Sequence, residues 1–169
     1  MSALSSQRST DAWTWGCDVR AGVAAFGALH TDGRCMTWSA SIGEQSPLRG
    51  AQRLVCYRDQ LDAMCARRAY PLPTVIVIEI PQMRGASQVV LMTHVGVTME
   101  WLQSNFPCPQ LELKSAQWKL NAGIGGGADK AAIMRRAVEL GLDTQPRPTL
   151  QDEADALVMA LAAQNVLQA

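Results

Sequence analysis

Alternation of apolar and polar residues marks the first part of the chain. Over residues 13–19 apolar side chains recur at every second position, which is the period of a β-strand. Residues 22–30 follow as a second strand, and Asp32-Gly33 is typical of a hairpin turn into a third strand over residues 34–42. The pattern therefore predicts an antiparallel meander of three strands.

Beyond the meander, helical spacing alternates with short apolar runs. The β-branched run Val-Ile-Val-Ile-Glu-Ile, which ends before Pro81, predicts a strand buried on both faces. Helices are expected over residues 47–69, 87–105, 128–140 and 152–165, further strands over 75–80 and 110–114, and a proline-containing linker over 144–149. This order predicts an α/β fold with a five-stranded mixed sheet, three meander strands and two parallel ones, flanked by helices. We expect one domain over residues 12–169 after a disordered tail over residues 1–11.

The charges of the chain balance. Its 169 residues include 15 Lys and Arg and 15 Asp and Glu, so the formal net charge is zero. This balance excludes a histone-like chain that binds nucleic acid through bulk charge, although a local basic patch stays compatible with it. Arginines outnumber lysines by 12 to 3, and guanidinium groups suit bidentate contacts with phosphate.

The sequence also argues against a membrane or secreted protein. No stretch approaches the roughly 20 apolar residues that span a bilayer, and the Ser/Thr-rich start lacks the apolar core of a signal peptide. The five cysteines are odd in number and never form a C-x-x-C pair. We therefore expect reduced thiols and a cytoplasmic location, without a disulfide framework or a zinc site.

Two acidic residues lie in predicted strands. Glu79 interrupts an aliphatic run, where a buried carboxylate is costly unless it is paired or binds a metal. Asp18 raises the same question on the first strand. Ordinary explanations stay open for both: Glu79 reaches solvent at its strand end, and Asp18 bonds its own backbone in a turn.

The last predicted helix carries a second pair of acids. Beyond its first turn this helix is apolar on all sides, which predicts that it is buried. Asp152 and Asp155 are three residues apart and therefore lie on one face. Capping of the helix dipole explains Asp152. It explains Asp155 less well, because Asp155 lies among residues that should be packed.

One explanation accounts for all four acids, namely that they converge on hard divalent cations. Oxygen ligands without Cys or His favour Mg²⁺ or Mn²⁺ over zinc. Two such ions about 4 Å apart can activate a water molecule and stabilise the leaving oxygen in phosphodiester hydrolysis. We therefore expect two ions per site.

These motifs resemble the RuvC family of Holliday junction resolvases, which has the RNase H-like fold. The resemblance rests on Gly16-Cys17-Asp18 at a strand end, Glu79 in a hydrophobic strand, and the segment Asp-Glu-Ala-Asp-Ala-Leu over residues 152–157. It extends to residues 115–119 and to the segment Gly-Ile-Gly-Gly-Gly-Ala-Asp-Lys over residues 123–130. In order and spacing it covers nearly the whole chain after residue 12.

The resemblance implies a three-layer RNase H-like fold and a homodimeric, Mg²⁺-dependent endonuclease of DNA recombination and repair that cuts four-way junctions by paired symmetric nicks. The residues that match the family's metal-binding acids are Asp18, Glu79, Asp152 and Asp155. Lys119 and Lys130 match its basic residues near the scissile phosphate and the junction backbone, which makes Lys119 a catalytic candidate.

The chain departs from the family at two places. The first motif is usually Ile-Asp-Pro-Gly, whereas residues 17–20 are Cys-Asp-Val-Arg. After the strand with Glu79 the family often presents an aromatic that separates bases at the junction, and this chain has Met83 and Arg84 instead. We expect Arg84 to contact DNA and Met83 to act either as an apolar wedge or as plain packing. The departures indicate a divergent member, for which a phage origin is a hypothesis.

The glycine-rich segment allows three interpretations. Gly123-x-Gly125-x-x-Ala128 matches the letters of a dinucleotide fingerprint, but a true fingerprint lies between two strands. A glycine loop before a helix N-terminus suits a backbone phosphate better, and a flexible connection without a ligand is the plainer alternative. Basic residues around this segment are expected to contact DNA, namely Lys114, Lys119, Lys130 and Arg135.

The sequence thus favours a metal-dependent junction endonuclease, with part of the apolar helix over residues 87–105 forming a two-fold interface. One alternative is another RNase H-like nuclease, either of the YqgF type on RNA or one that cuts other branched DNA. A second is a junction-binding protein with a degenerate metal site, against which four intact acids argue. A third, a nucleotide-binding enzyme, rests only on the glycine segment.

Overall fold

A computed structural model describes residues 12–43, 48–67, 70–81 and 88–168. Met83 and Arg84 lie outside the described residues, so their expected DNA contacts stay predictions. The elements in chain order are β1 (Trp13–Arg20), β2 (Val23–His30), β3 (Cys35–Ser41), α1 (Gly50–Arg67), β4 (Pro73–Glu79), α2 (Gln88–Asn105), β5 (Gln110–Leu113), α3 (Ser115–Asn121), α4 (Lys130–Glu139) and α5 (Leu150–Gln168). Among the described helices, none is long and apolar enough to cross a membrane.

The sheet has the strand order β3-β2-β1-β4-β5. β1, β2 and β3 pair antiparallel, while β4 pairs parallel to β1 and β5 pairs parallel to β4. The predicted five-stranded mixed sheet is therefore confirmed. The division of the chain into a tail over residues 1–11 and one domain over residues 12–169 stays a prediction.

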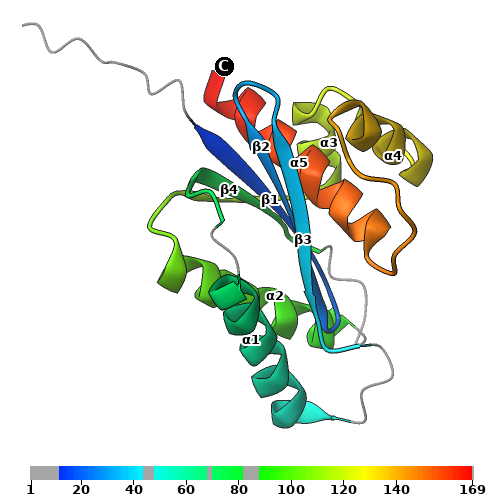
Figure 1. The fold of residues 1–169 in the computed structure, drawn as a ribbon. Coiled ribbons are helices and arrows are strands. Elements are labelled where there is room, and N and C mark those ends of the chain that lie inside the picture. The colour runs from blue at the N-terminus through cyan, green and yellow to red at the C-terminus, as the bar shows by residue number, and fades with distance from the viewer. Residues whose placement is uncertain (1–11, 44–47, 68–69, 82–87, 169) are drawn as a thin grey trace, which may run out of the picture.

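Helices cover both faces of the sheet and make three layers (Figure 1). On one face, α1 and α2 pack on side chains such as Trp15, Cys17 and Ile78. On the other face, α3, α4 and α5 pack on Leu29 and Val77. Because strand side chains alternate between faces, Thr14, Gly16 and Asp18 of β1 point toward α5. A hydrogen bond of 2.8 Å from Thr14 Oγ1 to the backbone oxygen of Ala160 in α5 agrees with this direction.

Two paired glycines allow α5 to lie directly on the centre of the sheet. Gly16 of β1 and Gly27 of β2 are register partners. A Cβ atom on Gly16 would lie 2.0 Å from the backbone oxygen of Ala156, and one on Gly27 would lie 2.4 Å from the Cα atom of Leu157. Only glycine permits this approach, which brings the first turns of α5 beside the end of β1.

The structure differs from the sequence prediction mainly in the segment before the glycine loop. Residues 115–121 form the short helix α3, for which no helix was predicted. α5 begins at Leu150, two residues before the predicted start, and β4 begins at Pro73 instead of residue 75. α3 matters for the site because it places Trp118 and Lys119 next to β4.

Candidate active site

Asp18 and Glu79 lie side by side at the edge of the sheet where two parallel strands end. Cys17 of β1 and Ile78 of β4 are register partners, and each acid is the next residue in its strand. Glu79 shares the face of Val77, which packs under α3 and α5. Both carboxylates therefore lie on the face of the sheet that α5 covers.

The first turns of α5 supply the other acids. Asp155 lines the same pocket as Asp18 and Glu79. Asp152 lies one turn earlier, and its Oδ2 accepts a hydrogen bond of 2.8 Å from Nε of Arg20 at the end of β1. Three of the four predicted acids thus share one pocket, while the fourth is ion-paired beside it.

Basic residues also line this pocket, whose volume is about 440 Å³. They are Lys119 of α3 and Lys130, the first residue of α4. Nζ of Lys119 donates a hydrogen bond of 3.0 Å to the backbone oxygen of Ala128, which ties α3 to the glycine-rich segment. Lys114 and Arg135 are exposed outside this lining. Of the five predicted basic residues, the structure therefore brings Lys119 and Lys130 to the acids, and Arg84 lies outside the described residues.

The carboxylates perturb one another. Burial, followed by the charges of Asp155, Glu79 and Asp152, raises the pKa of Asp18 well above its ordinary value. Burial also raises the pKa of Glu79, against a hydrogen bond from Trp118 and the charge of Lys119. Burial and the nearby acids raise the pKa of Asp155 to about 6. Such clustering of like charges is costly, and a bound cation would relieve it.

Comparison with solved structures finds a similar fold in RuvC of Thermus thermophilus. The Thermus thermophilus RuvC structure matches with a TM-score of 0.65 and 19% identity, over 92% of this chain and 95% of that one. T. thermophilus RuvC in complex with a Holliday junction substrate matches with a TM-score of 0.68 and 16% identity, over 93% and 95% of the two chains. The chain has a RuvC-like fold. Neither the protein-family models nor the curated proteins that were compared gave a match.

The donor set of this RuvC-like fold suits a hard cation, because every candidate ligand is a carboxylate oxygen. In the described part of the chain, however, no three Asp, Glu, His or Cys side chains are arranged as metal ligands. Three of the four acids have another partner: Trp118 donates to Glu79 at 2.7 Å, Gln151 donates to Asp155 at 3.2 Å, and Arg20 donates to Asp152 at 2.8 Å. Asp18, Glu79 and Asp155 fit a cation by donor chemistry and by their shared pocket, and Asp152 would join them after separating from Arg20.

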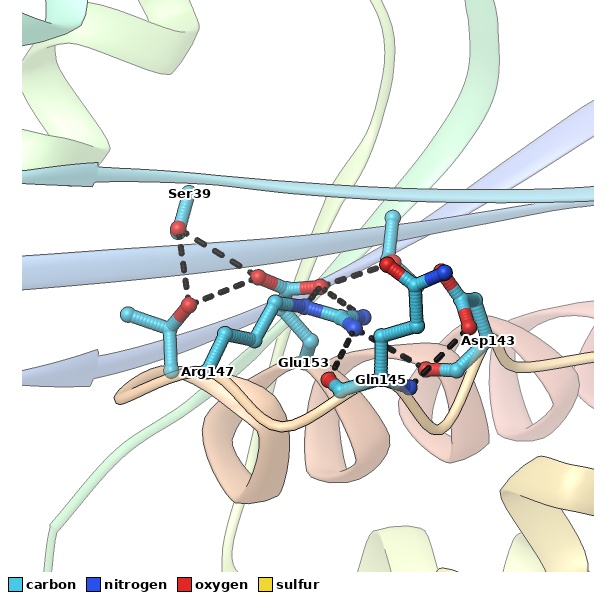
Figure 2. A network of polar contacts seen from close by, with 7 residues as sticks. Ser39, Asp143, Gln145, Arg147 and Glu153 are labelled. Atoms are coloured by element: carbon cyan, nitrogen blue, oxygen red, sulfur yellow. Dashed lines mark hydrogen bonds and ion pairs between the residues drawn. The ribbon is translucent and has the colours of Figure 1, made fainter.

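A fifth acid, Glu153, lies in the same motif but does not line this pocket. Its carboxylate lies instead in a polar network with Ser39 and Arg147 (Figure 2). It is 4% exposed and accepts hydrogen bonds from Arg147 (2.7 and 3.0 Å), Thr149 (2.7 Å), Thr37 (2.8 Å) and Ser39 (3.4 Å). Burial raises the pKa of Glu153, but these hydrogen bonds outweigh it and hold the pKa below its ordinary value. Glu153 thereby fastens the first turn of α5 to β3.

Sequence reasoning did not single out Glu153, Arg20 or Trp118. The signal for Glu153 is its position, because adjacent residues on a helix do not share a face. If Asp152 faces the pocket, Glu153 points about 100° away around the helix axis. Nothing in the sequence pairs Arg20 with Asp152, which lies 132 residues later.

Proposed function

We propose that this protein is a metal-dependent, structure-selective endonuclease that resolves four-way DNA junctions by paired nicks. The observation that supports this most is the convergence of Asp18, Glu79 and Asp155 from three separate elements in one pocket with two lysines. The RuvC-like fold supports the choice of DNA, since the structural neighbour binds a Holliday junction substrate.

The proposal assigns separate roles to the acidic and the basic side chains of the pocket. The three carboxylates, with Asp152 as a fourth ligand, would hold two Mg²⁺ ions, for which Mn²⁺ would substitute, and these ions would supply the Lewis-acid chemistry of phosphodiester hydrolysis. Lys130 is exposed at the pocket rim and can pair with a DNA phosphate. Lys119, held by Ala128, keeps a positive charge close to Glu79 and Asp155. Lys114 and Arg135 would contact the DNA arms outside the pocket.

Paired nicking would require two active sites related by two-fold symmetry, so we propose a homodimer. α2 is the candidate interface, because Val89 and Val90 on it are 58% and 51% exposed. Trp101, on the same helix, is fully buried and belongs to the core. The cytoplasmic location expected from the sequence belongs to the same proposal.

The glycine segment argues against a dinucleotide site. It follows helix α3 instead of a buried strand and leads into α4, with α5 as the next described element. Asp129 caps α4 by accepting a hydrogen bond of 2.8 Å from the backbone nitrogen of Ala132. Because the Asp129 carboxylate occupies this end of α4, the group of the segment that suits a DNA phosphate is the exposed Lys130 beside the acids.

The test is a panel of labelled substrates, namely a four-way junction, linear duplex, splayed arms and an RNA–DNA hybrid, each with Mg²⁺ or with EDTA. The proposal predicts cleavage of the junction alone, only with Mg²⁺, and none by Asp18→Asn. Cleavage mainly of splayed arms or the hybrid would favour another RNase H-like nuclease. Tight junction binding without cutting in either Mg²⁺ or Mn²⁺ would favour a non-cleaving junction-binding protein.

A further inference from the structure

Trp118 of α3 donates a hydrogen bond to one of the candidate metal ligands. Its indole Nε1 lies 2.7 Å from Oε2 of Glu79, and the residue also lines the acid pocket. The side chain is 1% exposed and belongs to the same core cluster as Val77 and Ala122. Because an indole has a single N–H and this ring is held by packing, the donor cannot turn to another partner.

This contact bears on the orientation of Glu79. Glu79 is the last residue of β4 and pairs with Leu113 of β5, so its backbone is held in the sheet while its carboxylate lies at the end of the strand. Hydrogen bonds to charged groups are stronger than those between neutral groups, and one fixed donor on Oε2 restrains rotation of the carboxylate. Groups that restrain a metal ligand in this way commonly tune the affinity for the metal.

α3 also connects Glu79 to the glycine-rich segment before Lys130. Lys119 follows Trp118 in the chain, bonds the backbone oxygen of Ala128, and places its Nζ 5.5 Å from the centre of the Trp118 ring. One short helix therefore contacts both the acid at the end of β4 and the glycine-rich segment before Lys130. Because Trp118 itself bonds Glu79, a substitution of Trp118 is expected to disturb the Glu79 carboxylate more directly than the glycine-rich segment.

We propose that Trp118 is a positioning residue whose indole N–H holds the Glu79 carboxylate in the orientation that binds a divalent cation. The inference rests on the proposed function, because it assigns Glu79 a metal ion. It adds that the affinity for this ion depends on a tryptophan hydrogen bond from α3.

The chain offers a matched control. Trp101 of α2 is also fully buried, and its Nε1 donates to Oδ1 of Asp62 at 2.9 Å on the other side of the sheet. Trp118→Phe and Trp101→Phe therefore make the same chemical change and each removes one indole–carboxylate hydrogen bond. Urea unfolding of both variants compares their losses of stability.

Two readouts separate positioning from packing. Mn²⁺ binding by calorimetry is expected to weaken about tenfold or more in Trp118→Phe and to stay near the wild-type value in Trp101→Phe. Junction affinity without metal is expected to be unchanged in both, while the cleavage rate at limiting Mg²⁺ falls only in Trp118→Phe and recovers at high Mg²⁺. If the wild type is active and the two variants bind Mn²⁺ with equal affinity, the inference about Trp118 is overturned and the proposed function stands.

A wild-type protein that neither binds Mn²⁺ nor cuts DNA would instead refute the proposed function. If Trp118→Phe does not fold, indole N–H resonances of the wild-type protein provide the test, with Trp118 assigned by elimination from the other single Trp→Phe variants. The Trp118 resonance is expected to shift on addition of Mg²⁺ and the Trp101 resonance to stay in place. An unmoved Trp118 resonance in a protein that binds Mg²⁺ would contradict the inference.

Discussion

Replacement of Asp155 by Asn should stabilise the metal-free protein. Asn has nearly the same shape as Asp and keeps Oδ1 as the acceptor for Gln151, but it removes one negative charge from the pocket. Asp155 has its pKa raised from 3.8 to about 6. A raised pKa means that the ionised form of Asp155 destabilises the folded state. Because Asn carries no charge, the variant lacks this destabilisation.

The magnitude follows from the shift. A difference of about two pKa units corresponds to roughly 3 kcal/mol at 1.36 kcal/mol per unit, and partial solvation of the side chain reduces the expected gain to about 2 kcal/mol. The gain should be complete above the folded-state pKa of about 6. It should vanish below the unfolded-state value near 4, where wild-type Asp155 is protonated in both states. For a domain of this size the melting temperature should rise by about 4–8 °C.

The assay is thermal or urea unfolding in EDTA at a series of pH values, repeated with excess Mg²⁺. Because a ligand stabilises the state that binds it, Mg²⁺ should stabilise the wild type near neutral pH and stabilise Asp155→Asn much less. Asp59→Asn, at an exposed position on α1, is the control and should change stability by no more than about 0.5 kcal/mol. A variant that is less stable than the wild type in EDTA, or that gains as much from Mg²⁺, would refute the reasoning.

Three further substitutions test the supports of the site. Gly16→Ala places a Cβ atom 2.0 Å from a backbone oxygen of α5 and should lower the free energy of urea unfolding by at least about 3 kcal/mol. Gly96→Ala, with open space around it, should raise that free energy by about 0.5–1 kcal/mol. A mild effect at Gly16 would contradict the close packing of α5. Glu153→Gln should lower the free energy of unfolding by about 2–3 kcal/mol at neutral pH. This loss of stability should shrink as the pH falls through the lowered pKa of Glu153, because protonation removes the same charge from the wild type. A loss of stability that does not change with pH would show that the charge is unimportant. Arg20→Met removes the cation beside Asp152 and should tighten Mn²⁺ binding about fivefold in calorimetry, equivalent to about 1 kcal/mol; weaker binding would mean that Arg20 supports the metal site.

The sheet and the positions of two acids could be predicted from local patterns. Alternation over β1 and the β-branched run of β4 are short-range signals, and parallel strands end at the same edge of a sheet. That is why Asp18 and Glu79 could be expected near one another. The apolar character of α5 likewise placed Asp155 among packed residues, and its neighbours Ala154 and Ala156 are fully buried.

Contacts between residues that lie far apart in the sequence could not be predicted from the sequence patterns. α3 spans seven residues with one fully packed side chain, Trp118, so it offers too few turns for a periodic signal. The ion pair between Arg20 and Asp152 depends on α5 crossing the end of β1, and that crossing in turn depends on Gly16 and Gly27. A glycine in a strand signals a close approach without identifying the element that approaches.

Single-turnover cleavage of a four-way junction labelled on each strand in turn tests the central claim most directly. The account predicts nicks at symmetric positions on two opposing strands in Mg²⁺, no cleavage in EDTA, and none by Asp18→Asn or Asp155→Asn. Cleavage that persists in both variants, or an intact junction fully bound by the wild-type protein in Mg²⁺ and Mn²⁺, would contradict it.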